Sequence, residues 1–408
     1  MIGFNILRAG ALAAALLLAS AGTAFAQGAD ANTVRPEVGK PLQAAEALYK
    51  AKKYREALAK IAEADAAAGR TAYENYIIER TRGSIAAAAG DHNTAARAFE
   101  AVIATGRASG SEQLKLVQAV AGLHYHAKDY AKAAQWALRY QKEGGADPAM
   151  RTVLVQSYYL MNDCNGVSRV VGGADDHNGR RTSEQELQIL ANCYSRQKDD
   201  SGYVAAIERL VTHYPKKEYW TDLLNRVQRK SGFSSRLSLD VFRLKLETGN
   251  LTSANDYLEM AQLAIQAGFP AEAKKVVDRG YAEKVLGVGK EAERHQRLRD
   301  LTVKTLAEAT SNRDRIENEA LADKSGDALF GVGYSFVTEG APQKGLALME
   351  RGLKKGGLRR PDDAKLLLGI AQLKSGARAR GLQTLRDVHG KDGTSDLARL
   401  WILIGQRA

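Results

Sequence analysis

The stretch Arg82–Val102, RGSIAAAAGDHNTAARAFEAV, contains two short helical patterns that meet at Gly90. The first pattern carries the small residue Gly83, and the second carries Ala95 and, four residues later, Phe99. Small residues facing a large one let two helices pack closely, so the stretch predicts an antiparallel helical hairpin. One hairpin cannot bury its own apolar face, and we therefore expect copies of it to stack along the chain.

The small residue of the second helix recurs through the sequence. Its equivalents are Ala57, Ala95, Ala133, Val167, Tyr203, Ala273, Gly345 and Gly381. These positions are 38, 38, 34, 36, 70, 72 and 36 residues apart, so each long step hides one degenerate copy. A hairpin repeated at this interval predicts an all-α solenoid, whose core grows with the number of units. The composition agrees, because Ala and Leu dominate and only 7% of the 408 residues are aromatic.

This pattern resembles the tetratricopeptide repeat family, which implies a right-handed superhelix of stacked hairpins. The residues that carry the resemblance are Gly83, Ala86, Gly90, Asp91, Ala95 and Phe99; Ala121, Lys128, Asp129, Tyr130, Ala133 and Pro148; Leu187, Leu190, Ala191, Tyr194 and Pro215; Gly333, Phe336, Gly340, Gly345 and Met349; and Leu368, Gly369, Gly376, Gly381 and Leu385. The sequence departs from the pattern at Tyr203, where a small residue belongs, and over 289–324, which has only the period.

Three repeat regions are expected. Regular repeats cover residues 41–215, degenerate helical repeats cover 216–324, and regular repeats with a capping helix cover 325–408. The capping helix over 395–406 keeps an apolar run from Trp401 to Ile404, although the outer face of a cap should be polar.

The first 26 residues are expected to be a cleavable signal peptide. Residues 1–8 carry one positive charge, residues 9–19 are apolar, and Ala24-Phe25-Ala26 forms a cleavage site before Gln27. The apolar run is shorter than the roughly 20 residues that a membrane-spanning helix needs, although an uncleaved anchor is the alternative. We therefore expect cleavage near Ala26/Gln27, a flexible leader over 27–40, and a soluble periplasmic protein with no transmembrane segment in the mature chain.

The chain is basic, with a net charge of +12 that falls to +11 when Arg8 leaves with the signal peptide. An exported basic protein favours acidic partners, such as segments of other envelope proteins or acidic glycans, and nucleic acid is not expected. The alternative is that most of these cations simply solvate the outer faces of helices. The densest basic cluster lies over residues 354–360.

Nothing in the sequence predicts catalysis, a cofactor or a metal. His124 and His126 are two residues apart, so their rings point to different sides of a helix and cannot share one ion. Residues 175–177, Asp-Asp-His, lie in a glycine-rich stretch that is better explained as a turn than as a cation site. Because no phosphate loop, G-x-S-x-G or H-E-x-x-H motif is present, we expect a non-enzymatic protein.

Cys164 and Cys193 are the only cysteines. In the hairpin register Cys164 begins a second helix and Cys193 lies late in the next first helix, so a disulfide between neighbouring units is geometrically reasonable. The alternative is a buried packing Cys193 and a free thiol at Cys164.

If the repeats stack as in the family, the first helices line a concave groove. The positions that point away from the seam of each hairpin are Arg80, Ser84, Gln118, Tyr125, Thr152, Gln156, Tyr159, Gln188, Asn192 and Arg196. Such amide, hydroxyl and aromatic groups suit an extended peptide, although a merely solvated face is the alternative. We expect a scaffold or adaptor that binds an envelope protein along this groove, as accessory repeat proteins of transport or secretion machines do. A module that binds peptidoglycan or anionic polysaccharide is the second candidate.

Overall fold

The computed structural model describes residues 32–173 and 181–407. The expected signal peptide, the leader residues 27–31 and the Asp-Asp-His stretch over 175–177 lie outside the described residues. Within the described ranges the chain forms 21 α-helices and one 3-10 helix, with no strand, which confirms the all-α prediction. None of these helices combines the length and the apolar character that crossing a membrane requires.

The chain forms two compact units, Met1–Tyr203 (unit 1) and Val204–Ala408 (unit 2). The division falls at Tyr203, the position where the small residue of the repeat is missing. The loss of the small residue therefore coincides with the end of the first compact unit.

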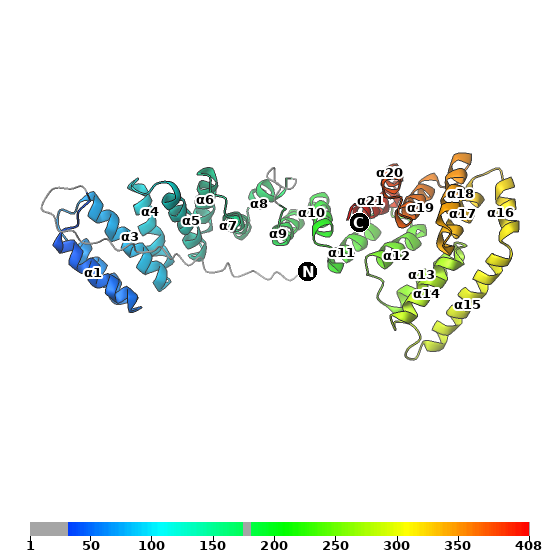
Figure 1. The fold of residues 1–408 in the computed structure, drawn as a ribbon, viewed down its shortest axis with the longest axis horizontal. Helices are drawn as coiled ribbons and strands as arrows, with labels where there is room; N and C mark the ends of the chain where they lie inside the picture. Colours follow the sequence, from blue (N-terminus) through cyan, green and yellow to red (C-terminus); the bar gives the residue numbers. More distant parts are fainter. Residues whose placement is uncertain (1–31, 174–180, 408) are drawn as a thin grey trace. The chain divides into compact units, whose positions relative to one another are not determined.

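Unit 1 is a stack of helical hairpins (Figure 1). Its helices are α1 (Pro36–Lys50), α2 (Tyr54–Asp65), α3 (Ala72–Ala89), α4 (His92–Ala104), α5 (Gly110–His126), α6 (Tyr130–Lys142), α7 (Pro148–Leu160), α8 (Cys164–Val171) and α9 (Glu184–Arg196), and α10 (Asp200–His213) begins here and continues into unit 2. From α1 to α9 each helix contacts the next one, and first helices also contact one another, as α5 does α7 and α7 does α9. The predicted stack of antiparallel helical hairpins is confirmed.

The hairpin of α3 and α4 shows how the sequence produces these contacts. Gly90 ends α3 in the left-handed conformation, with φ of 79°, and the Asp91 side chain then caps α4 by accepting a hydrogen bond from the Thr94 amide. A methyl group on Gly83 would lie 2.5 Å from the Phe99 ring, so this position requires glycine. The equivalents of Ala95 in α2, α6 and α8 are likewise fully buried.

The first helix begins earlier than expected, at Pro36 and not near Pro41. Proline suits the first position of a helix, and Val38, which was expected in a flexible leader, is fully buried. Arg35 donates from its side chain to both carboxylate oxygens of Glu74 on α3 at 2.9 Å. This hydrogen bonding lowers the pKa of Glu74 to about 2. The contact joins residues 39 apart and was not readable from local pattern.

Unit 2 contains the degenerate repeats and the C-terminal repeats. Its helices are α11 (Lys217–Arg229), η1 (Ser235–Leu237), α12 (Ser238–Glu247), α13 (Ala254–Gln266), α14 (Pro270–Ala282), α15 (Ala292–Ser311), α16 (Arg313–Ala322), α17 (Asp327–Glu339), α18 (Pro342–Lys355), α19 (Pro361–Lys374), α20 (Arg378–Arg386) and α21 (Thr394–Arg407). The last helix contacts α19 and α20 and also α12, far back in the sequence. Trp401 is therefore buried, whereas Ile402, Leu403 and Ile404 are half-buried.

Ion pairs hold the C-terminal segment against the η1 region of unit 2. The Arg236 guanidinium in η1 lies 2.7 Å from carboxylate oxygens of both Asp363 and Asp392. The Thr394 hydroxyl and Arg236 together lower the pKa of Asp392 to about 2. The expected cap is thus packed against the beginning of its own unit.

A buried ionic cluster joins α12, α14 and α17. Arg243, only 4% exposed, donates to Glu272 at 2.6 and 2.7 Å and to Asp240 at 2.7 Å. Burial raises the pKa of Asp240, whereas the pKa of Glu272 is lowered because Arg243 outweighs the effect of burial. The Tyr334 hydroxyl donates to Glu272 at 3.3 Å, and Phe269 packs edge-on against the Tyr334 ring. This cluster holds α14 directly against α17.

Candidate functional site

Side chains from successive first helices of unit 1 bond to one another on one face. We call this set the polar ladder, and its members from the predicted groove are Arg80, Gln118, Tyr125, Gln156, Tyr159, Asn192 and Arg196. The contacts link α3 with α5, α5 with α7, and α7 with α9. Five of the ten predicted groove positions bond to one another across neighbouring helices, namely Tyr125, Gln156, Tyr159, Asn192 and Arg196, while Arg80 and Gln118 bond to Glu112 and Asp147 of the next unit.

The individual contacts of the polar ladder are short. Arg80 lies 3.3 Å from the Glu112 carboxylate, and Gln118 donates to Asp147, the cap of α7, at 2.6 Å. The Tyr125 hydroxyl donates to the Gln156 side-chain oxygen at 2.7 Å.

The lower end of the ladder centres on Tyr159. Its hydroxyl donates to the Asn192 side-chain oxygen at 3.0 Å and accepts from Arg196 at 2.9 Å. The Arg196 guanidinium also lies 4.5 Å from the centre of the Tyr159 ring, in a cation–π contact. An exposed guanidinium, an aromatic face and an amide are thereby gathered at one place.

Two predicted groove residues, Ser84 and Thr152, bond within their own helices. Ser84 is buried and donates to the Arg80 carbonyl one turn earlier, and Thr152 bonds to the Pro148 carbonyl in its own helix. Gln188 is half-buried on α9. Ser84 and Gln156 are 8% and 6% exposed, so both are too enclosed to contact a partner directly, and Gln156 instead positions the Tyr125 hydroxyl.

The structure pairs Cys164 with Cys193 as a disulfide, with the two Cα atoms 5.2 Å apart. The bond ties the start of α8 to the late part of α9, in the register that the hairpin pattern indicated. Because Cys193 follows Asn192, the disulfide also anchors the helix that carries the lower end of the polar ladder.

The histidines of unit 1 take different roles. His124 is buried and lies 2.7 Å from Glu100, which also accepts from the Trp136 indole at 3.1 Å. The His126 ring instead lies 5.2 Å from the His92 ring, and burial together with His92 lowers the pKa of His126. In the part of the chain that the structure describes, no group of three or more His, Cys, Asp or Glu side chains is gathered as a metal site.

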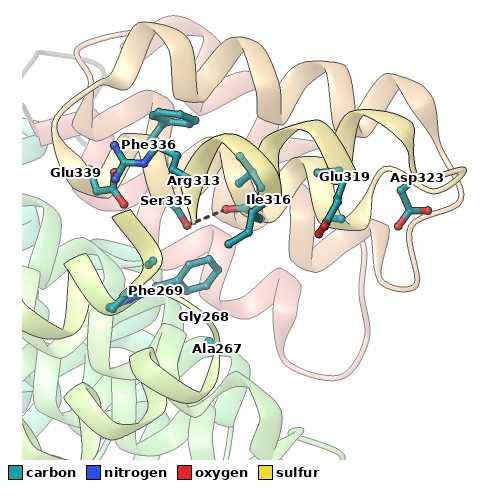
Figure 2. Close-up of a pocket in the computed structure, with 16 residues that line it drawn as sticks. Ala267, Gly268, Phe269, Arg313, Ile316, Glu319, Asp323, Ser335, Phe336 and Glu339 are labelled. Carbon is teal, nitrogen blue, oxygen red and sulfur yellow. Dashed lines mark hydrogen bonds and ion pairs between the residues drawn. The ribbon is translucent and has the colours of Figure 1, made fainter. Parts of the chain in front are cut away.

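Unit 2 contains a cleft that the sequence did not reveal (Figure 2). It has a volume of about 480 Å³ and lies between the α13–α14 turn, α16 and α17. Its walls are mostly apolar and include Phe269, Ile316, Val332 and Phe336. We call this hollow the α16–α17 cleft; its volume falls in the range of protein ligand sites.

The charged residues of the cleft lie at two places. At one end Arg313 pairs with Glu339 and lies over the Phe336 ring. Figure 2 shows Glu319 and Asp323 farther along α16, beyond Ile316 and away from that pair. The second end of the cleft is therefore acidic.

The cleft exists because the hairpin of α15 and α16 is poorly packed. Of the residues in α16, only Ala320 is buried, and Ile316 is 37% exposed. In α15, Leu301 and Val303 are 45% and 49% exposed. Since α14 packs directly on α17, this hairpin is not enclosed between its neighbours as regular units are. The stretch 289–324, which matched only the repeat period, is thus the one that leaves a hollow.

A glycine of α17 deepens the cleft without serving the packing. A methyl group on Gly331 would meet no atom within 4 Å, although one on Gly333 would lie 2.6 Å from the Met349 backbone nitrogen. Glycine inside a helix costs about 0.5–1 kcal/mol relative to alanine. At Gly333 close packing against α18 explains the glycine. At Gly331 no packing contact requires a glycine, and its absent side chain leaves the cleft open. Gly331 could have pointed to the cleft from the sequence, but only the structure shows that no neighbouring helix requires a glycine there.

No protein-family model matches the sequence. No curated protein matches it either.

Solved structures with a similar arrangement include three helical-repeat proteins. The complex of Naa15/Naa10 bound to HypK-THB is 14% identical with a TM-score of 0.33, and the match covers 88% of this chain but only 65%, less than two thirds, of that chain. The TPR domain of P58(IPK) is 12% identical with a TM-score of 0.23, covering 90% and 98%. Yeast Tom70 is 10% identical with a TM-score of 0.25, covering 90% and 95%.

Proposed function

We propose that the protein is a non-enzymatic scaffold of the bacterial cell envelope that binds an extended segment of a partner envelope protein along the polar ladder of unit 1. The partner belongs to a transport or secretion machine. The observation that carries this proposal is the set of cross-helix bonds that aligns polar side chains over α3, α5, α7 and α9. Stacked helical repeats are well suited to such a role because they present extended concave surfaces.

The chemistry of the ladder suits a peptide backbone. An extended segment presents one amide donor and one carbonyl acceptor per residue, and the ladder offers amides, hydroxyls and guanidinium groups. The bonds between units hold side chains such as Tyr159 and Arg196 in one conformation, so less side-chain entropy is lost on binding. A preorganised polar surface therefore binds with less cost than a mobile one.

A predicted signal peptide and a disulfide support the envelope location. The predicted signal peptide directs the chain out of the cytoplasm, and a disulfide between Cys164 and Cys193 persists in an oxidising compartment. We therefore place the working protein in the periplasm.

Photo-crosslinking in intact cells tests the proposal. A benzophenone side chain at Thr152 should capture a defined envelope protein, and the same group at Val288, an exposed apolar position of unit 2, serves as the control. Substitution of Tyr125→Phe, Tyr159→Phe and Gln188→Ala together should abolish capture while the helical content is retained. If every crosslink survives this triple variant, the ladder is not the binding surface.

A glycan-binding module is the second candidate, because Arg196 stacked on Tyr159 resembles a site for an acidic sugar and the chain is basic. Sedimentation with purified cell-wall sacculi in moderate salt distinguishes the protein-binding scaffold from the glycan-binding module. Binding that persists there without protein partners, and is lost on Arg196→Ala, favours the glycan.

A further inference from the structure

We propose that the α16–α17 cleft of unit 2 is a docking site for a short partner segment with a large apolar anchor residue next to lysine or arginine. The occupant is a peptide of another protein, and the site is separate from the polar ladder. The proposal rests on the shape of the cleft, on its charge, and on one glycine.

The apolar walls favour an apolar anchor. Figure 2 shows Phe269 from the α13–α14 turn pointing toward Ile316 from α16, and Phe336 from α17 lines the cleft beside Arg313. A volume of about 480 Å³ gives room for large side chains. Ile316 is 37% exposed, so covering it removes apolar surface from water.

The acidic end of the cleft favours a basic residue next to the apolar anchor of the partner peptide. Glu319 lies in the last turn of α16 and Asp323 directly follows that helix, where the negative end of the helix dipole disfavours carboxylates. Asp323 accepts a hydrogen bond from the Ser325 backbone amide at 3.0 Å, and Lys355 at the end of α18 donates to the Leu321 carbonyl at this helix end at 3.0 Å. Glu319 pairs with Arg315, but both side chains are over 60% exposed. The carboxylates of Glu319 and Asp323 are both exposed, so a lysine or arginine of the partner could pair with them.

Gly331 is the third argument. The position lies inside α17 and lines the cleft, and a side chain there would project into open space. A bulkier residue would improve the helix and fill the hollow without a clash. The sequence retains an unfavourable glycine at the place where a side chain would occupy the docking volume.

Binding of displayed peptides to the mature chain tests the inference. A phage library of random short peptides is selected on the wild-type chain, and each enriched peptide is then measured against three variants. Gly331→Leu fills the cleft, Gly331→Ala is the matched control that leaves most of it open, and Glu319→Lys with Asp323→Lys reverses the acidic end. A Tyr125→Phe, Tyr159→Phe variant controls for binding at the polar ladder, so failure here and failure of the proposed function are distinguishable.

We expect enriched peptides with a Leu, Phe or Trp beside Lys or Arg. Gly331→Leu should weaken their binding at least about tenfold, as loss of a buried anchor does, and the double charge reversal should weaken it as well. Gly331→Ala and the ladder variant should bind them normally.

Four results would overturn the inference. These are the absence of any enriched peptide that distinguishes Gly331→Leu from wild type, enrichment of neutral or acidic peptides in the cleft, binding unaffected by charge reversal, and self-association of the wild-type chain that Gly331→Leu abolishes. The last result would show that the occupant is a second copy of this chain.

Discussion

The hairpin of α3 and α4 in unit 1 and the hairpin of α15 and α16 in unit 2 use the same repeat length in opposite ways. In the first, Gly83 admits the Phe99 ring, and the pair is enclosed by its neighbours. In the second, α16 buries only Ala320 and leaves a cleft against α17. The comparison teaches that close matches to the repeat build the stack, whereas the weakly matching stretch 289–324 leaves a cleft against α17.

The largest effect is expected in the buried cluster that supports the cleft. Arg243→Met keeps the volume of the side chain but leaves Asp240 and Glu272 buried without their cation. Breaking a buried ion pair in this way costs about 3–5 kcal/mol. Denaturation followed through Trp220 and Trp401, both buried in unit 2, should show this loss, and Trp136 in unit 1 should report none.

The control for that variant is Arg297→Ala. Arg297 and Glu293 form an ion pair whose side chains are 72% and 93% exposed, and such pairs contribute little. If the two variants were equally stable, the cluster would not be what holds α14 against α17.

The next largest effect is expected from the disulfide, which lies within unit 1. Replacing Cys164 and Cys193 together with serine opens a loop that spans 29 residues and should cost unit 1 about 3 kcal/mol. The loss should appear in the Trp136 transition and leave the transition of unit 2 in place. Reduction of the wild-type chain should reproduce it, and an unchanged transition after both treatments would contradict a stabilising disulfide.

The third effect concerns a glycine required by packing. Gly333→Ala places a methyl group against the Met349 backbone, which cannot move aside as the end of a flexible side chain can. Overpacking of this kind costs about 1–3 kcal/mol. Thermal unfolding of unit 2 measures it, and an alanine tolerated without loss would mean that α17 and α18 can separate freely.

Much of the regular architecture was predictable from the sequence. The spacing of Ala57, Ala95 and Ala133 identified the hairpins because each lies at a seam where only a small side chain fits. The same register placed Tyr125 and Tyr159 on one face, where they are now seen to bond to the next unit. Which molecule that face binds stays a prediction.

The features that were missed depend on contacts between distant residues. Arg35 reaches Glu74 across 39 residues, so the helix that begins at Pro36 resembled a flexible leader. Arg236 reaches Asp392 across 156 residues, and local periodicity contains no information about such a return. The cleft was missed for the same reason, since it requires α14 to pack past an intervening hairpin onto α17.

A pH-dependent effect compares the two units at their long-range ion pairs. The folded-state pKa of Glu74 is about 2, below its ordinary value of 4.5, so ionised Glu74 stabilises unit 1 above pH 4.5 and this stabilisation is lost as the pH falls toward 2. The pKa of Asp392 is lowered from 3.8 to about 2, so ionised Asp392 should likewise stabilise unit 2 above pH 3.8, and this stabilisation should be lost as the pH falls toward 2. Glu74→Gln should be less stable than wild type at pH 7 and equal to it near pH 2.

Hydrogen exchange in peptides from α1 and α3 measures this effect locally. Asp392→Asn should leave exchange in these helices unchanged and increase it in η1 and α21. A Glu74→Gln variant with wild-type exchange at pH 7 would show that the contact with Arg35 does not hold α1.

The smallest effect has the opposite sign from the others and bears most directly on the comparison. Gly331→Ala adds a methyl group that meets no atom within 4 Å and removes a helix glycine, so it should stabilise unit 2 by about 0.5–1 kcal/mol. Gly333→Ala, two positions away on the same helix, is its matched control and should destabilise. Thermal unfolding of both variants should therefore move the unit 2 transition in opposite directions. If Gly331→Ala also destabilises, the position is constrained by packing after all, and its glycine no longer distinguishes the hollow of unit 2 from the closed seams of unit 1.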